Sequence, residues 1–323
     1  MNNPLYSFID LFAGVGGIRL AFTRNGCSCV FSSEWDVHSQ KTYQKNFGEL
    51  PYGDITKIEA ADVPDHDILT GGFPCQPFST IGKREGFSHP TQGTLFYDIA
   101  RIIKEKKPSV FLLENVAGLY SHDSGETFKV IKKTLEKELG YWVDDKILDS
   151  ADFGVPQHRK RVYIVGFRKD LSPNKNFQFD WPKKEQNKVG IGQFVEKGIS
   201  GYTISKHLQG SYIFKKDDGR PQIIDTDSNI QVKTLVSTYH KIQRLTGTFV
   251  RDGETGLRLL SENECKAIMG FPEYFEFPVS RTQMYRQMGN SVAVPVVEKV
   301  AAQIVKQLAR LHEAQAKYKL KTA

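Results

Sequence analysis

The chain has 323 residues, a formal net charge of +7, 25% charged residues and 39% hydrophobic residues. This ordinary globular composition suits one large domain with a smaller one, and no apolar run reaches the 18 residues that a membrane span needs. Four scattered cysteines exclude a disulfide framework, and the first residues lack a signal-peptide pattern, so we expect a cytoplasmic protein with no membrane contact.

Short apolar runs alternate with helical patterns over the first 170 residues. Such alternation predicts a doubly wound α/β sheet. The expected strands are residues 5–11, 29–33, 68–70, 110–113 and 162–167, and the expected helices include residues 18–25, 95–106 and 128–139.

Helical periodicity disappears between residues 185 and 259, where Gly, Thr, Ser, Lys and Asp are frequent. We interpret this stretch as a second, smaller, mostly β domain, with a β-like piece at residues 231–236. Residues 1–184 and 260–323 would form the main domain. A capping-box pattern, Ser261 to Glu264, opens its last part, and residues 292–319 are predicted to be a helix packed on its sheet.

Three strand-end turns have the residues of an adenosine-binding pocket. The first strand leads into a glycine turn that lacks the G-x-G-x-x-G spacing of dinucleotide sites, which argues against a nicotinamide oxidoreductase. The second ends in Glu34 and Trp35, suited to ribose hydroxyls and to an adenine ring, although Glu34 could instead cap a helix and Trp35 could be a core aromatic. Asp54 and Ile55 could close the same pocket.

A second group of residues suggests covalent chemistry. Cys75 follows an apolar strand on a turn with two prolines, where a thiol is either an inert buried group or a nucleophile. Glu114 ends another strand, in a partly buried place that would raise its pKa, or else it caps the next helix. Arg159 and Arg161 alternate with Lys160, so in an extended segment they share a face, unless the run is a solvated turn. The net positive charge allows a nucleic-acid partner without requiring one.

Taken in order, these motifs closely resemble those of the bacterial cytosine-carbon-5 DNA methyltransferases, the methylases of type II restriction–modification systems. The resemblance runs from residue 8 to about residue 297. It is carried by Phe12-Ala13-Gly14-x-Gly16-Gly17, Glu34-Trp35-Asp36, Gly53-Asp54-Ile55, Gly72-Phe73-Pro74-Cys75-Gln76, Glu114-Asn115-Val116, Gln157-x-Arg159-x-Arg161 and Gln287-x-Gly289-Asn290-Ser291-Val292.

The resemblance implies a Rossmann-like methyltransferase sheet that uses S-adenosyl-L-methionine, releases S-adenosyl-L-homocysteine and needs no metal. It makes Cys75 the nucleophile, Glu114 the contact to the ring nitrogen, Arg161 the contact to the base carbonyl and Arg159 a supporting cation. It also implies a cofactor-binding set: Phe12, Gly14, Gly17, Glu34, Trp35, Asp54, Ile55, Pro74, Leu95, Asn290 and Ser291.

On the same basis the partner is double-stranded DNA, bound by a monomer, with residues 185–259 as the target-recognition domain. Gln209 resembles the glutamine that fills the gap left by a displaced base in some relatives, and residues 80–93 are expected to form a loop that closes on the DNA. The expected DNA contacts are Ser79, Lys83, Arg84, Gln209, Thr234, Tyr239, Lys241 and Arg244.

Two other functions remain open at this point. A tRNA cytosine methyltransferase would use the same scaffold, and a non-catalytic DNA-binding relative would keep the fold without the reaction. A partner restriction endonuclease acting on the same site is expected if the chain belongs to a restriction–modification pair.

Overall fold

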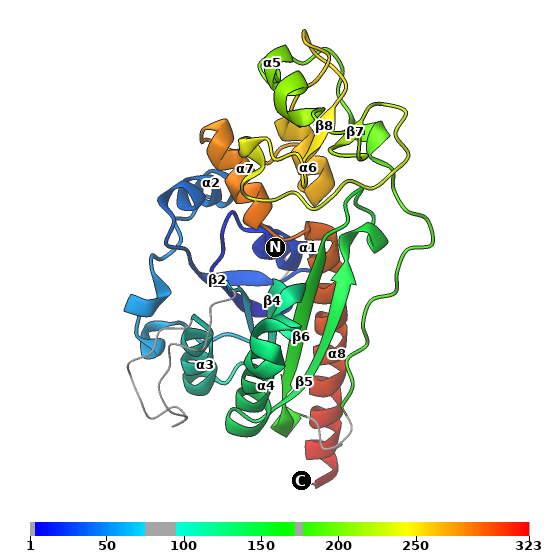
Figure 1. The fold of residues 1–323 in the computed structure, drawn as a ribbon. Coiled ribbons are helices and arrows are strands. Elements are labelled where there is room, and N and C mark those ends of the chain that lie inside the picture. The colour runs from blue at the N-terminus through cyan, green and yellow to red at the C-terminus, as the bar shows by residue number, and fades with distance from the viewer. Residues whose placement is uncertain (1–3, 75–94, 172–176, 323) are drawn as a thin grey trace.

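A computed structural model describes residues 4–74, 95–171 and 177–322, with side chains described to residue 316. Figure 1 shows a large domain built around a sheet and a smaller domain beyond one end of it. The sheet has the order β2-β1-β3-β4-β6-β5. Its strands are β1 (Ser7–Leu11), β2 (Ser28–Ser33), β3 (Ile68–Gly72), β4 (Val110–Val116), β5 (Tyr141–Asp149) and β6 (Lys160–Arg168).

Helices cover both faces of this sheet because its central strands are apolar on both sides. Alternate residues divide between two cores: Phe8, Ile68 and Val110 belong to one, Ile9 and Leu69 to the other. Helices α1 (Gly17–Arg24) and α8 (Val294–Thr322) pack on the first face, and α3 (Leu95–Lys106) and α4 (Glu126–Lys133) on the second. The doubly wound α/β fold is confirmed.

The sheet is not parallel throughout. Strands β2, β1, β3 and β4 run parallel, whereas β6 is antiparallel to both β4 and β5. Residues 141–149, for which the sequence predicted no strand, form β5. The reversal of β6 matters for the site because the first residues of β6 then lie beside the last residues of β4, with Arg161 paired to Val116.

The smaller domain has little regular structure within the described residues. Its strands are β7 (Gln222–Ile224) and β8 (Thr248–Val250), and its helical turns include η10 (Ile191–Phe194), α5 (Lys206–Leu208), η11 (Gln209–Ile213) and η12 (Tyr239–Lys241). The predicted β piece at 231–236 is not a strand, because it contributes only an isolated bridge between Val232 and Gln157. That bridge ties the smaller domain to the start of β6.

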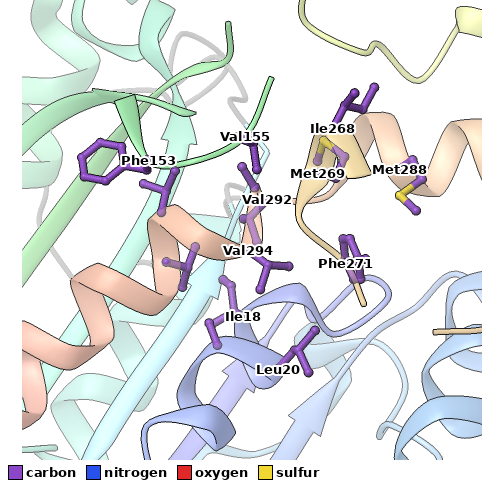
Figure 2. Close-up of a cluster of buried hydrophobic side chains, with 14 of the residues drawn as sticks. Ile18, Leu20, Phe153, Val155, Ile268, Met269, Phe271, Met288, Val292 and Val294 are labelled. Carbon is purple, nitrogen blue, oxygen red and sulfur yellow. The ribbon is translucent and has the colours of Figure 1, made fainter. Parts of the chain in front are cut away.

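Helices α2 (Val37–Phe47), α6 (Glu262–Met269) and α7 (Arg281–Asn290) complete the main domain. The capping box at α6 is confirmed, with both the Ser261 and the Glu264 bonds present. Figure 2 shows where the segments meet: Ile18 of α1, Val155, Met269 of α6 and Val294 of α8 belong to one buried cluster. No helix in the described part of the chain is both long and apolar enough to span a bilayer.

Candidate active site

The glycine turn after β1 leaves open space above its backbone. Phe12, Gly14 and Gly16 have φ values of 57°, 57° and 88°, in the left-handed region that glycine tolerates best. The Gly14 N–H donates to Glu34 Oε2 at 2.8 Å, which fixes the turn against the end of β2. A Cβ built on Gly14 would meet no atom within 4 Å. The turn is therefore a cradle that a ligand can approach closely.

Glu34 and Trp35 have the surroundings of ligand-binding residues. Glu34 also accepts from the Asp36 N–H at 2.8 Å, and burial raises the pKa of its carboxyl group. The cap of α2 is Asp36, whose side chain accepts from Ser39 N–H, so Glu34 is not the helix cap. Trp35 is 77% exposed, so it is not a core aromatic either.

The third turn lies against the second. The Glu34 N–H donates to the Tyr52 carbonyl at 2.8 Å, and Asp54 follows two residues later, capping a short 3-10 helix that begins at Ile55. Tyr52 stacks on Phe31 with the ring centroids 4.7 Å apart and is 61% exposed. Sequence reasoning missed Tyr52, although an aromatic residue two positions before Asp54 was a visible signal.

The end of α7 contacts the glycine turn, so it borders the predicted cofactor pocket as well. A Cβ on Gly17 would lie 3.0 Å from Ser291 Oγ, so Ser291 touches the glycine turn, and Asn290 beside it is exposed. Pro74 is exposed and Leu95 is half-buried as the first residue of α3, and no described contact joins either of them to this pocket. Open backbone, a buried acid and an exposed indole fit an adenosine-containing cofactor.

Glu114 and Arg161 form an ion pair at the edge of the sheet, with Arg161 Nε 3.1 Å from Glu114 Oε1. Glu114 is 9% exposed. Burial raises the pKa of its carboxyl group, while Arg161 and Arg159 act in the opposite direction. The group is thus a carboxyl that keeps a proton to higher pH than usual, next to a fixed positive charge.

Arg159 has a different role from Arg161. It is 3% exposed, and its guanidinium donates to the carbonyls of Leu235 at 3.1 Å and Gly289 at 3.0 Å, and also to that of Ser291. Burial and the nearby Arg161 lower its pKa to about 10, which leaves it charged at neutral pH. Arg159 therefore joins three chain segments behind the Glu114–Arg161 pair.

Two buried amides, which the sequence motifs include but to which no role was assigned, support this edge. Asn115 Nδ2 donates to the Phe73 carbonyl at 2.9 Å, and Gly72 pairs with Glu114, so β4 holds the segment that leads to Cys75. Gln157 accepts from the Leu235 N–H at 2.7 Å and donates to the Ile268 carbonyl. Cys75, Ser79, Lys83, Arg84 and the rest of the predicted closing loop lie outside the described residues.

A family model described as C-5 cytosine-specific DNA methylase matches residues 6–306, which span both the pocket and this edge. The chain belongs to the C-5 cytosine-specific DNA methylases. It is accordingly a DNA cytosine-5 methyltransferase, and the family uses S-adenosyl-L-methionine as its methyl donor. The residues that meet around the glycine turn, among them Glu34 and Ser291, have the chemistry to hold that cofactor.

Curated relatives agree with this assignment. The methylase is 62% identical to the type II methyltransferase M.MspI of a Moraxella species over 299 residues, which are 93% of this chain and 70% of that protein. It is 58% identical to M.BsuFI of Bacillus subtilis over 303 residues, 94% of this chain and 73% of that protein.

Solved structures of low sequence identity have a fold similar to that of this chain. The S. pombe Dnmt2 methyltransferase has a TM-score of 0.74 at 22% identity and covers 94% of this chain and 99% of its own. The Entamoeba histolytica methyltransferase EhMeth has a TM-score of 0.73 at 21% identity and covers 95% of this chain and 99% of its own.

Three of the predicted DNA contacts of this methylase are buried in its smaller domain. Gln209 donates to the Ile204 carbonyl at 2.7 Å, Tyr239 donates to the Thr248 carbonyl at 2.6 Å, and Arg244 pairs with Asp218. They are 8%, 4% and 7% exposed, respectively. In this structure their polar groups hold the domain together and are not presented to a ligand. Lys241 is exposed, and Thr234 is half-buried with its hydroxyl donating to the His158 carbonyl at 2.6 Å.

Proposed function

We propose that this protein methylates carbon 5 of one cytosine within a short duplex DNA sequence, with Cys75 as nucleophile, as the modification enzyme of a restriction–modification system. The observation that carries the proposal is the pair of the buried Glu114 with Arg161, since Glu114 lies on β4, next to the strand that leads to Cys75. The type II names of relatives at 62% and 58% identity support the restriction–modification context.

The other three cysteines are poor candidates for a nucleophile. Cys27 and Cys265 are buried and Cys29 is half-buried, and all three are free thiols. Burial raises the pKa of Cys27 to about 11, that of Cys29 to about 12 and that of Cys265 well above its ordinary value. Because the thiolate is the reactive form, these thiols are unreactive at neutral pH. The elimination leaves Cys75.

The bound cofactor would supply a methyl group on a positively charged sulfur. The chain's own residues have to make carbon 5 of cytosine nucleophilic. The Cys75 thiolate adds to carbon 6, so an S–C bond forms and electron density moves to carbon 5, while the Glu114 carboxyl group holds a proton at ring N3. Arg161 would orient Glu114 and contact the base carbonyl.

The adduct then has to decompose. Once carbon 5 carries the methyl group, its proton leaves to a base and the Cys75 thiolate is expelled, which restores the 5,6 double bond. The ring edge is inaccessible in a stacked duplex, so the cytosine must leave the stack at a cost of a few kcal/mol.

A methyl-transfer assay tests the proposal. Protein, duplex DNA and a methyl-labelled donor are incubated with the wild type, with Cys75→Ser, and with Cys29→Ser as a matched control. We expect label in duplex cytosine for the wild type and for Cys29→Ser, and a loss of at least about 1,000-fold for Cys75→Ser. Undiminished transfer by Cys75→Ser would contradict the proposed nucleophile. A parallel reaction with tRNA in place of the duplex separates the two substrate classes, since preferential labelling of tRNA would contradict the DNA assignment.

A further inference from the structure

The side chain of Arg244 ties two loops of the smaller domain together. Its guanidinium donates from Nε to the Ile213 carbonyl at 3.0 Å, from Nη2 to the Lys216 carbonyl at 2.7 Å and from Nη1 to Asp218 Oδ2 at 2.9 Å, and Nη2 also bonds Asp218 Oδ1. The Arg244 N–H donates to the hydroxyl of Tyr212 at 3.3 Å. Residues 212–218 and the turn at 239–246 are thus one unit, fixed by a single bidentate arginine.

The turn at 239–246 is anchored at both ends and exposed between them. Tyr239 is buried, donates to the Thr248 carbonyl and accepts from the Leu260 N–H at 3.0 Å, and Arg244 is buried on the other side. Lys241 and Gln243 between these anchors are exposed, as is Leu245 after them, at 58%. A turn that buries its anchors and exposes an ammonium and an amide has the groups that read base edges.

The turn is also held at a fixed position relative to the sheet edge that carries Glu114 and Arg161. Leu235, four residues before Tyr239, is held by Arg159 and Gln157 through its carbonyl and N–H. The intervening backbone passes so close to α7 that a Cβ on Gly289 would lie 2.1 Å from Ser237 N. Helical turn η12 packs on α7. A short, immobilised segment therefore connects the exposed turn to the residues behind Glu114.

The charge of this unit suits a polyanion. Lys215, Lys216 and Lys241 are exposed, as is Asp217, while the carboxylate of Asp218 is paired with Arg244. The unit therefore keeps a net positive charge. Tyr212 and Phe214, at 43% and 50% exposed, come directly before Lys215 and Lys216 in the sequence. Exposed aromatic side chains beside cations are typical of nucleic-acid contact surfaces.

We propose that Lys241 and Gln243 are base-reading residues of this methylase and that Arg244, paired with Asp218, is the positioning residue that holds their turn. The inference rests on the proposed function. That function requires recognition of a DNA sequence, and the inference assigns part of this recognition to named residues. It gives Arg244 an indirect role in place of the direct DNA contact that the sequence predicted.

The test measures steady-state methyl transfer on the recognised duplex and on duplexes with one base pair of the site changed. Arg244→Met and Asp218→Asn are expected to raise the KM for the recognised duplex and to lower discrimination against changed duplexes by about tenfold, with kcat and the KM for the methyl donor nearly unchanged. Arg244→Lys should recover part of the discrimination. Lys241→Ala and Gln243→Ala should each relax the preference at one base pair. The matched control is Arg310→Met. Arg310 lies on α8 and makes an exposed ion pair with Asp180.

Thermal melting separates positioning from loss of folding, and Asp218→Asn provides the milder change if Arg244→Met unfolds. Wild-type discrimination in the folded Arg244 and Asp218 variants would overturn the positioning role, and unchanged base preference in both Lys241→Ala and Gln243→Ala would overturn the reading role. Wild-type protein that transfers no methyl group to any duplex would instead contradict the proposed function, and this inference with it.

Discussion

At the edge of the sheet, the buried carboxyl group of Glu114 lies beside the guanidinium group of Arg161. Burial raises the pKa of Glu114, and Arg161 beside it limits that rise. The sequence placed both residues at strand ends, and their contact follows from the antiparallel direction of β6, which no feature of Gln157 to Arg161 predicts. The sequence also did not predict that Arg161 and Arg159 have different partners. Their alternation predicts a shared face, but Arg159 binds the carbonyls of Leu235 and Gly289.

The role of Glu114 predicts a large kinetic effect from a small change. Glu114→Gln keeps the size of the side chain but removes the carboxyl proton donor, so methyl transfer should fall by about 100- to 10,000-fold. The measurement is single-turnover transfer to duplex DNA. Glu276→Gln is the control, because Glu276 makes an exposed pair with Lys45. Equal rates for Glu114→Gln and the wild type would remove Glu114 from the mechanism.

A second buried acid predicts a pH dependence of stability. Asp10 is fully buried on β1, with Oδ1 accepting from Thr70 Oγ1 at 3.1 Å, and burial raises its pKa from 3.8 to about 7. The folded protein keeps this proton up to about pH 7, whereas the unfolded chain loses it near pH 4. The contribution of the protonated Asp10 to the free energy of unfolding is therefore complete below pH 4. It is lost between pH 4 and 7, at about 1.4 kcal/mol per pH unit.

Asp10→Asn removes that titration. The free energy of unfolding of Asp10→Asn minus that of the wild type should rise by about 2–3 kcal/mol between pH 5 and pH 7.5, as measured by urea denaturation. A difference that does not change with pH would show that Asp10 is ionised in the folded protein across this range.

At the scale of elements, the helices and parallel strands with strong patterns were predictable. Helix α3 has the predicted bounds, because its apolar residues at helical spacing and Pro108 after it leave little choice. Strand β5 was missed because Asp144, Asp145 and Lys146 interrupt its apolar pattern and only its residues Tyr141 and Leu148 are buried. The 231–236 stretch has β-branched residues but is held by side chains of the main domain instead of a neighbouring strand, which composition does not reveal.

The capping box of α6 predicts an effect on stability. Ser261 accepts from the Glu264 N–H at 3.1 Å and also donates to Glu196, and Glu264 in turn binds Arg258. Ser261→Ala should lower the free energy of unfolding by about 1–2 kcal/mol, as measured by urea denaturation. Ser280→Ala is the matched control, because Ser280 caps α7 from an exposed position through a 3.4 Å bond and should cost less. Equal costs for the two serines would contradict a special role for the Glu196–Ser261–Glu264 network.

At the scale of the whole molecule, the two domains are joined by buried contacts. The predicted division after residue 259 falls within a buried network, since Arg258 on one side pairs with Glu264 on the other at 2.8 Å and both are fully buried. Sequence motifs singled out the glycine turn, Glu34, Glu114 and Arg161 as expected site residues. They could not predict this joint, because it depends on buried contacts such as Gln157 to Leu235 between residues 78 positions apart.

Close packing at the joint predicts that one methyl group will disturb it. A Cβ on Gly289 would lie 2.1 Å from Ser237 N and 2.3 Å from the Val236 carbonyl carbon, both backbone atoms that cannot rotate away. Gly289→Ala should cost about 1–3 kcal/mol in unfolding free energy and raise the KM for duplex DNA. Gly118→Ala is the control, because a Cβ there meets nothing within 4 Å. Wild-type stability and KM in Gly289→Ala would contradict a rigid joint.

Bisulfite sequencing of DNA from cells that express the protein tests the central claim most directly, because it reports the methylated base and its sequence context together. We predict protected cytosines at one short recurring sequence with the wild type, and none above background with Cys75→Ser. Protected cytosines with no common sequence, or the same protected sites with Cys75→Ser, would contradict a sequence-specific cytosine-5 methyltransferase acting through Cys75.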